Sequence, residues 1–250
     1  MSVVNLLRGM GNELYKFAFP VYRPLYSTFK SYADRVERKL LAEHLSPGCV
    51  VVDAGANVGI YSQFLSKCVG PTGAVHSFEP SPDNFKRLRA ALKAFPNVQL
   101  HQLSVSDKTG KSVLYVSDTL NVDHRAYPIE DEPRRGESIH STRLDDYFKP
   151  GQHVDLIKMD IQGYELHALQ GAERVLEDNP DVKLLLEFWP YGLNQAGVSP
   201  DAFISFLQDR GFAIFLPGEN GLVNCDRPPS DPSDPAHYLN LFAKKATEQP

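Results

Sequence analysis

Short apolar runs alternate with amphipathic segments along most of the chain. Continuous apolar runs are typical of strands that are buried on both faces, and these predict strands at residues 49–53, 74–78, 98–103, 154–159 and 182–188. Between them, apolar residues recur every three or four positions, as on one face of a helix. This spacing predicts helices at residues 29–45, 58–67, 82–94, 164–176 and 199–210. Strands that alternate with helices predict an α/β fold with a mostly parallel sheet covered on both faces.

The remaining segments depart from this alternation. Residues 111–116 predict a strand in an antiparallel excursion, and residues 117–137, poor in apolar residues, predict a long loop. Residues 212–215 and 238–243 predict two closing strands, which we expect to pair antiparallel because no helix separates them. We divide the chain into an N-terminal helical segment, residues 1–45, and a main domain that contains the rest.

Composition narrows the class of protein. Of the 250 residues, 42% are hydrophobic and 10% aromatic, which excludes a globally disordered chain. No apolar run approaches the roughly 18 residues that a membrane span needs. The net charge is −5, so a nucleic-acid binder, which usually has a basic surplus, is disfavoured. Cys49, Cys68 and Cys225 suit neither a disulfide framework nor a zinc site, and no signal peptide begins the chain; we expect a cytoplasmic protein.

A glycine-rich turn follows the first predicted strand, in the segment Asp53-Ala-Gly-Ala-Asn-Val-Gly59. Gly55 and Gly59 allow the backbone to approach a ligand, and the next helix offers N–H groups at its N-terminus. The dinucleotide motif GxGxxG is not met, because Asn57 stands where its middle glycine would be. Asp53 would repel a pyrophosphate but suits the ammonium group of an amino acid.

Carboxylates also follow three later strands. Glu79 ends the second strand, where an acid can accept hydrogen bonds from both hydroxyls of a ribose. Asp160 and Glu187 end the strands at residues 154–159 and 182–188. Because open α/β sheets bind ligands at the carboxyl ends of their strands, these acids are candidates for a site, although each could equally cap a helix or a loop.

These motifs resemble the FkbM family of S-adenosylmethionine (SAM)-dependent methyltransferases. The resemblance runs from about residue 35 to 245 and rests on five segments in the same order. They are Asp53-Ala-Gly-Ala-Asn-Val-Gly59, Phe78-Glu-Pro-Ser-Pro-Asp-Asn84, Leu103-Ser-Val-Ser-Asp107, Ile157-Lys-Met-Asp-Ile-Gln-Gly163 and Asn240-Leu-Phe-Ala243. The resemblance implies a class I, Rossmann-like fold with a mostly parallel seven-stranded sheet and a terminal antiparallel strand. It also implies SAM as methyl donor, usually a hydroxyl acceptor, and a methyltransferase domain over residues 46–250.

Carried over position by position, the resemblance implies a cofactor site. Glu79 would hold the ribose. The residues that would surround the methionine half of SAM are Asp53, Gly55, Asn57 and Gly59.

The same resemblance places the other half of the cofactor and the reaction centre. Ser104 and Val105 would line the adenine, and Asp160 would lie beside the reactive methyl group. This chain has Gln162 where many members have Glu, so an acid is not expected to act at that position.

Methyl transfer to a hydroxyl requires the nucleophile about 3–3.5 Å from the methyl carbon, and a general base assists it. We expect His124, in the long polar loop, to be this base, with Asp123 or Asp160 orienting or replacing it. The alternative is that His124 only packs in the loop. No spacing demands a metal, and none is predicted.

We therefore expect O-methylation of a hydroxyl on a small molecule or sugar. A SAM-binding protein without catalysis and a nicotinamide-dependent dehydrogenase remain open, although Asp53 and the missing GxGxxG count against the latter. Residues 1–28 are rich in aromatic side chains and contain Pro20 and Pro24. We expect them to pack on the domain, over the acceptor pocket or on a second subunit, which makes a homodimer possible.

Overall fold

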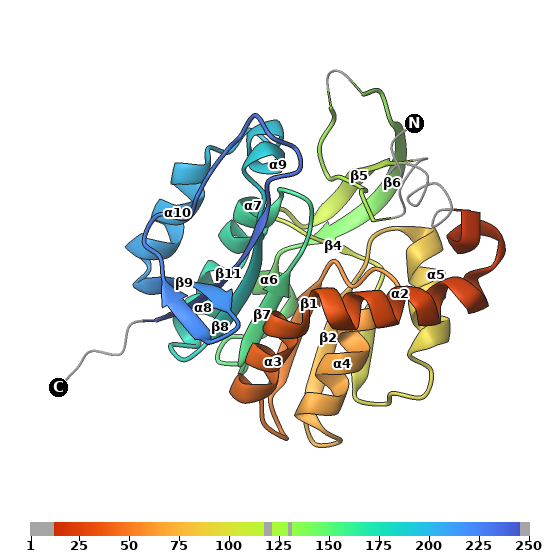
Figure 1. The fold of residues 1–250 in the computed structure, drawn as a ribbon, viewed down its shortest axis with the longest axis horizontal. Helices are drawn as coiled ribbons and strands as arrows, with labels where there is room; N and C mark the ends of the chain where they lie inside the picture. Colours follow the sequence, from red (N-terminus) through yellow and green to blue (C-terminus); the bar gives the residue numbers. More distant parts are fainter. Residues whose placement is uncertain (1–12, 118–121, 130–131, 246–250) are drawn as a thin grey trace.

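The computed structural model describes residues 13–117, 122–129 and 132–245. Within this part of the chain, an eight-stranded, mostly parallel sheet has helices on both faces, and a three-stranded sheet lies beside it (Figure 1). The main sheet has the order β10-β9-β11-β8-β7-β1-β2-β3. Its strands are β1 (Val50–Ala54), β2 (Ala74–Phe78), β3 (Val98–His101), β7 (Leu156–Met159), β8 (Lys183–Phe188), β9 (Phe212–Gly218), β10 (Gly221–Asn224) and β11 (Leu239–Lys245).

Along each strand of this sheet, successive side chains point to opposite faces. Val51 of β1 and Leu185 of β8 pack against one layer of helices, while Val52 and Leu184 pack against the other. Helices α3 (Arg35–His44) and α4 (Ile60–Val69) cover the first face. The second face is covered by α7 (Glu165–Gln170), α8 (Glu173–Asp178) and α10 (Pro200–Asp209). Burial on both faces explains why these strands are continuous apolar runs.

Helices α2 (Phe19–Ala33), α5 (Pro82–Ala91), α6 (Leu144–Tyr147) and α9 (Pro190–Gln195) are also present. No helix in the described residues is long and apolar enough to cross a membrane. Strands β1, β2, β3, β7 and β8 are parallel, whereas β11 pairs antiparallel with both β8 and β9. The predicted parallel sheet and the antiparallel pairing of the closing strands are thus confirmed. The eighth strand, β10, was not predicted; it forms a hairpin with β9.

The predicted helix over residues 29–45 was wrong at its start. Helix α2 begins at Phe19, and a turn at Asp34 separates it from α3. Pro20 is tolerated because the first helical turn has no N–H partners to lose. Pro24 lies inside the helix, where it costs a hydrogen bond. Packing of the neighbouring Tyr22 and Tyr26 against the domain offsets that loss.

The second sheet consists of β4 (Ser104–Val105), β5 (Gly110–Val116) and β6 (Arg135–Thr142). Strand β5 pairs antiparallel with β6, which confirms the predicted excursion. Strand β6 was not predicted, and its first three residues had been assigned to the loop over residues 117–137. Of that loop, residues 118–121 and 130–131 lie outside the described part of the chain, as do residues 1–12 of the N-terminal segment.

The backbone after β1 is held very close to the backbone after β7. Gly55 has a φ of +78°, and a Cβ atom at this position would lie 2.0 Å from the carbonyl oxygen of Asp160. The Asp160 N–H also donates to the Ala54 carbonyl at 3.2 Å. A side chain at residue 55 would therefore separate the two strand ends that face each other across the top of the sheet.

We predict that Gly55→Ala destabilises the protein more than Gly197→Ala. Gly197 has nearly the same φ, +80°, but nothing lies within 4 Å of its added Cβ. The control substitution should cost about 1–2 kcal/mol for the left-handed backbone alone. Gly55→Ala adds a clash with fixed backbone, worth about 1–3 kcal/mol more. Urea unfolding of both variants measures the difference; equal losses would contradict the close approach.

Candidate functional site

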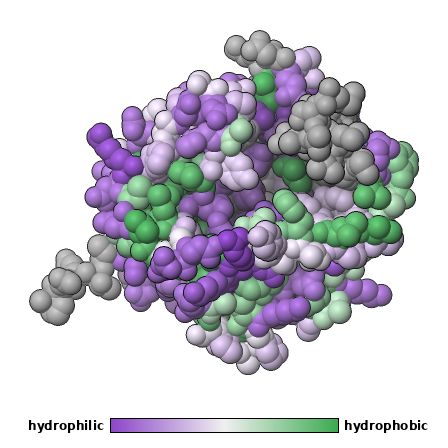
Figure 2. Space-filling model, viewed as in Figure 1, coloured by the Kyte–Doolittle hydropathy of each residue, from purple (hydrophilic) through white to green (hydrophobic). Residues whose placement is uncertain are grey.

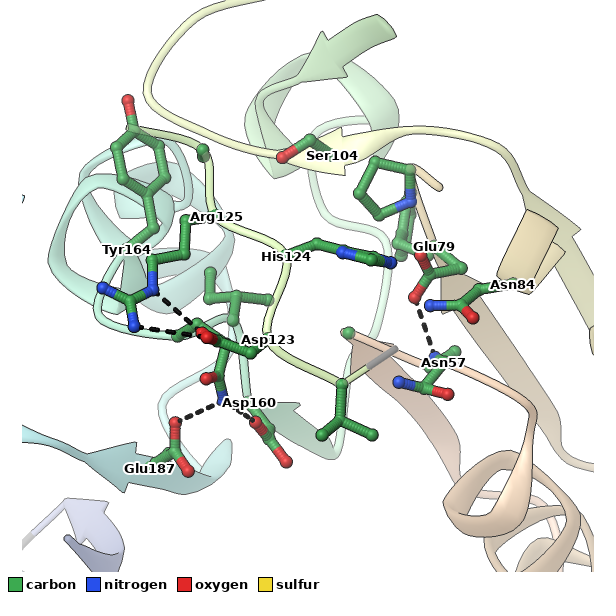
Figure 3. Close-up of a pocket in the computed structure, with 18 of the residues that line it drawn as sticks. Asn57, Glu79, Asn84, Ser104, Asp123, His124, Arg125, Asp160, Tyr164 and Glu187 are labelled. Carbon is green, nitrogen blue, oxygen red and sulfur yellow. Dashed lines mark hydrogen bonds and ion pairs between the residues drawn. The ribbon is translucent and has the colours of Figure 1, made fainter. Parts of the chain in front are cut away.

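A cavity of about 460 Å³ opens at the carboxyl ends of the central parallel strands. Figure 3 shows how its polar side chains converge from several elements, and Figure 2 shows the hollow on the surface. Eight of the ten predicted site residues line it, and Asp53 and Gly59 do not. The eight are Gly55, Asn57, Glu79, Ser104, Val105, Asp123, His124 and Asp160.

The glycine-rich turn is tied to the end of β2. Both Gly55 and Ala56 donate their backbone N–H to the Phe78 carbonyl at 3.0 Å. The N–H of Asn57, which has a positive φ of 49°, donates to Oε2 of Glu79 at 2.9 Å. The predicted ribose-binding acid and the predicted turn are therefore one hydrogen-bonded unit.

Glu79 lies almost entirely buried at the end of β2, yet it lines the cavity. Its Oε1 accepts a hydrogen bond from the Ser81 N–H at 2.9 Å. Burial raises its pKa to about 7, although the hydrogen bonds from Ser81 and Asn57 oppose this shift. The side-chain amide of Asn84 is a third donor to this carboxylate, so one of its four lone-pair positions is left for a ribose hydroxyl.

Asp53 is fully buried beneath the cavity wall and already has partners. Its Oδ2 accepts from the Ser62 hydroxyl at 2.7 Å, and its Oδ1 lies 3.2 Å from the ammonium of Lys158. Burial works against the charge of Lys158, but the carboxylates of Asp53 and Asp160 raise its pKa. Sequence reasoning missed Lys158, because a lysine in the middle of a buried strand resembles an interruption of the apolar run.

Gly59 has a packing role in this structure. A Cβ atom there would lie 2.8 Å from a methyl carbon of Leu88 and 3.1 Å from one of Leu92. The glycine therefore lets α4 start close against α5, and its contribution to a ligand site is indirect.

Three polar side chains form a bridge between the ends of β7 and β8. The Gln162 amide donates to Oδ1 of Asp160 at 3.2 Å and to Oε2 of Glu187 at 3.1 Å. Burial and the neighbouring acid Asp160 raise the pKa of Glu187 well above its ordinary value. The bridge therefore holds two acids side by side in a setting that disfavours the ionised form of Glu187.

The loop that carries His124 is anchored by arginines. Oδ1 of Asp123 lies 2.9 Å from Nε of Arg125, and its Oδ2 lies 2.6 Å from Nη2 of Arg134. Arg125 also lies over the Trp189 ring, 4.8 Å from the centroid. In its backbone, Arg125 exchanges hydrogen bonds of 2.8 and 3.1 Å with Tyr115 of β5. These contacts hold residues 122–126 at the cavity wall.

His124 points into the cavity on the same side as Glu79 (Figure 3). Its Nδ1 accepts a hydrogen bond from the Ser117 N–H at 3.2 Å. Burial lowers the pKa of the imidazole, so the ring is neutral at neutral pH. In a neutral ring whose Nδ1 accepts, the proton is on Nε2.

The N-terminal segment contributes to the same cavity. Tyr26 and Lys30 of α2 line it, and the Tyr15 hydroxyl donates to Oδ1 of Asn84 at the start of α5. Arg87 stacks on Tyr15 at 4.0 Å from the ring centroid. The expectation that this segment packs on the domain and over the pocket thus holds for its described residues. No group of acids, histidines and cysteines in the described chain could hold a metal ion.

The family model of the methyltransferase FkbM domain matches residues 53–214. The chain belongs to the FkbM methyltransferase family. This membership confirms the resemblance seen in the motifs, and it makes the protein a methyltransferase with SAM as its methyl donor. It also removes the dehydrogenase alternative.

Individual FkbM relatives are distant. The chain is 24% identical over 189 residues to the 2-O-methyltransferase NoeI of Sinorhizobium fredii, covering 68% of this chain and 74% of the relative. It is 31% identical over 160 residues to the 31-O-demethyl-FK506 methyltransferase FkbM of Streptomyces tacrolimicus, covering 52% of this chain and 61% of the relative.

Solved structures confirm the class I methyltransferase fold. The methyltransferase FkbM of Methylobacillus flagellatus aligns over 89% of this chain with a TM-score of 0.50 and 18% identity, and this chain spans 54% of it. A Streptococcus mutans protein, solved in complex with SAH, aligns over 85% of this chain and 97% of its own length, with a TM-score of 0.51 and 13% identity.

We predict that SAM binding strengthens as the pH rises through about 7, because Glu79 accepts from the ribose best as a carboxylate. With a pKa of about 7, its ionised fraction increases roughly tenfold between pH 6 and 8. The dissociation constant for SAM should fall by up to that factor, as measured by calorimetry. In Glu79→Gln, this part of the pH dependence should disappear; an unchanged profile would remove Glu79 from the site.

The same pKa has a consequence for stability in the absence of SAM. The pKa of Glu79 in the folded state lies above its ordinary value of 4.5. Its contribution to folding is therefore fully present below pH 4.5 and is lost as the pH rises through about 7. The Gln variant should lose this pH dependence as well.

We predict that Lys158→Met costs about 3–5 kcal/mol of stability, because it leaves Asp53 charged and unpaired in the core. The double variant Asp53→Asn with Lys158→Met should recover much of this loss, since no uncompensated charge then remains. Urea unfolding of the two variants tests the pair; a single variant as stable as the parent would contradict it.

Proposed function

We propose that the protein transfers the methyl group of SAM to a hydroxyl group of a small molecule or sugar. The observation that carries the proposal is the Asp160 carboxylate at the cavity wall. Among the described residues, Gln162 is the one hydrogen-bond donor to this carboxylate, and it occupies Oδ1, so Oδ2 can receive a proton from an acceptor. Two FkbM relatives whose names specify O-methylation support the choice of a hydroxyl.

The polar groups around the cavity fit SAM. Glu79 keeps a lone pair for a ribose hydroxyl, and the N–H groups of Asn57 and Ser81 hold its carboxylate in place. Ser104 and Val105 of β4, which were predicted to line the adenine, also line the cavity. When bound, SAM supplies an electrophilic methyl group on a positively charged sulfonium.

In this proposal Asp160 is the general base. The amide of Gln162 holds its carboxylate from one side and holds Glu187 from the other. Burial and the neighbouring Asp160 disfavour a charge on Glu187, which reduces the repulsion between the two acids. Asp160 would then take the proton of the acceptor hydroxyl, while bound SAM would supply the methyl group and leave as the neutral thioether.

His124 has a different part in the reaction. Its Nδ1 lone pair is engaged by the Ser117 N–H, and its Nε2 carries the ring proton. In this tautomer the imidazole donates a hydrogen bond into the cavity, which positions an acceptor or cofactor oxygen. Asp123, which was considered as a partner for His124, has both carboxylate oxygens engaged by Arg125 and Arg134 and anchors the loop.

The net charge and the cysteines support a proposal for the type of acceptor and for the cellular compartment. A net charge of −5 supports a small acceptor over a nucleic acid, whose phosphates require a basic surface. Cys49, Cys68 and Cys225 are all free thiols, which supports a reducing, cytoplasmic compartment.

We predict that Asp160→Asn lowers turnover about 10²–10⁴-fold at saturating acceptor, because the base is lost. The dissociation constant for SAM should stay within a few-fold of the parent value.

His124→Gln is the matched variant, since a glutamine amide can replace the donor at Nε2 but cannot act as a base. It should keep most of the activity, while His124→Ala loses more. If Asp160→Asn were fully active and both His124 variants were inactive, the general base would be His124 instead.

A further inference from the structure

Glu79 receives hydrogen bonds from three donors, of which one is a side chain. The donors from Asn57 and Ser81 are backbone N–H groups, whose directions are fixed by the turn after β1 and by the start of α5. The third donor is the side-chain amide of Asn84, which lies beside Glu79 (Figure 3). The terminal torsion of an asparagine side chain is broad, so the direction of this amide depends on what holds its other end.

Tyr15 of the N-terminal segment holds that other end. Its hydroxyl donates to Oδ1 of Asn84, and the Nδ2 end of the amide then faces Glu79. Both side chains are buried, with exposed fractions of 6% for Tyr15 and 1% for Asn84. Burial raises the pKa of Tyr15 to about 12, so the hydroxyl keeps the proton that it donates. A donor to the amide oxygen also strengthens the amide N–H as a donor in its turn.

Packing accounts for the ring of Tyr15 but not for its hydroxyl. The ring belongs to the same apolar cluster as Val58 and Ile60, which flank the last glycine of the turn after β1. The guanidinium of Arg87, one turn after Asn84 on α5, lies 4.0 Å from the ring centroid. A phenylalanine ring would make these contacts equally well, so the hydroxyl is the part of the residue that needs another explanation.

We propose that Tyr15 is a positioning residue for the cofactor, which acts through Asn84 to direct the Glu79 carboxylate toward the ribose of SAM. The inference rests on the ribose-binding role that we assign to Glu79. With three of its four lone-pair positions occupied, this carboxylate has one direction left for a ribose hydroxyl. Without the Tyr15 hydroxyl the amide can turn, and two backbone donors alone then hold the carboxylate.

The N-terminal segment would in this way serve both ligands of the enzyme. Tyr26 and Lys30 of α2 line the cavity directly. Tyr15, just before α2, reaches the cofactor side through a single intervening side chain.

The test compares two ligands by calorimetry, S-adenosylhomocysteine (SAH) and its 2′,3′-dideoxy analogue, which lacks both ribose hydroxyls. In the parent SAH should bind more tightly, and the ratio of the two dissociation constants reports the hydrogen bond to the ribose. Tyr15→Phe keeps the ring and should reduce this ratio about three- to tenfold, as expected for the loss of one hydrogen bond of ordinary strength. A merely structural role would weaken both ligands alike and leave the ratio unchanged.

Tyr147→Phe is the matched control. It also removes a hydrogen-bonded tyrosine hydroxyl, which contacts His76 at 2.9 Å and His101 at 2.8 Å, and Tyr147 does not line the cavity. The ratio in this variant should equal that of the parent.

A double-mutant cycle shows whether the hydroxyl acts through the amide. Asn84→Ala should lower the ratio at least as far as Tyr15→Phe does. Adding Tyr15→Phe to Asn84→Ala should then have no further effect, because the group that transmits the effect is already gone.

An unchanged ratio in Tyr15→Phe would overturn the inference, and this variant decides alone if Asn84→Ala does not fold. A further drop in the double variant would overturn it as well, because the hydroxyl would then act by another route. Glu79→Gln separates this inference from the role of Glu79 itself. If the ratio in Glu79→Gln equals that of the parent, Glu79 does not bind the ribose; if it falls while Tyr15→Phe has no effect, only the role of Tyr15 is wrong.

Discussion

The close approach of three strand ends at the top of the sheet is the constraint on which the site depends. The chain leaves β1 through Gly55, which lies against the Asp160 backbone after β7 and donates to the Phe78 carbonyl at the end of β2. Because backbone groups fix this junction, Glu79 and Asp160 are held on opposite sides of one turn. The site is thus preorganised by main-chain hydrogen bonds, which need no ligand to form.

The sequence predicted the central strands and the edge at which acids gather, because both follow from local patterns. A strand buried on two faces must be continuously apolar, and the first polar residue after it must lie at the carboxyl edge. Strand β6 escaped prediction because Ser138, His140 and Ser141 break its apolar pattern, and its pairing with β5 depends on a long connection. The start of α2 was obscured by Pro24, whose cost is offset by contacts that only the fold provides.

Partners of site residues were the least predictable part. Asp53 and Lys158 are 105 positions apart in sequence, and nothing local indicates that β1 and β7 bring them within 3.2 Å. Asp123 is a similar case. Its partner Arg125 is close to it in the sequence, but its second partner, Arg134, lies at the far end of the loop. The residue types indicated the chemistry of the site. The ion-pair partner of each acid became clear only from the three-dimensional structure.

The charges that remain on the acids around the cavity determine what the cavity can bind. Burial and the neighbouring Asp160 disfavour a charge on Glu187, and the charge of Asp53 is paired with that of Lys158. Asp160 remains as the carboxylate that faces the cavity without a cationic partner at ion-pair distance among the described residues. A single uncompensated carboxylate at the junction favours a cation beside it, and a sulfonium is one. In the proposed reaction, the same carboxylate would hold the proton that the acceptor hydroxyl loses.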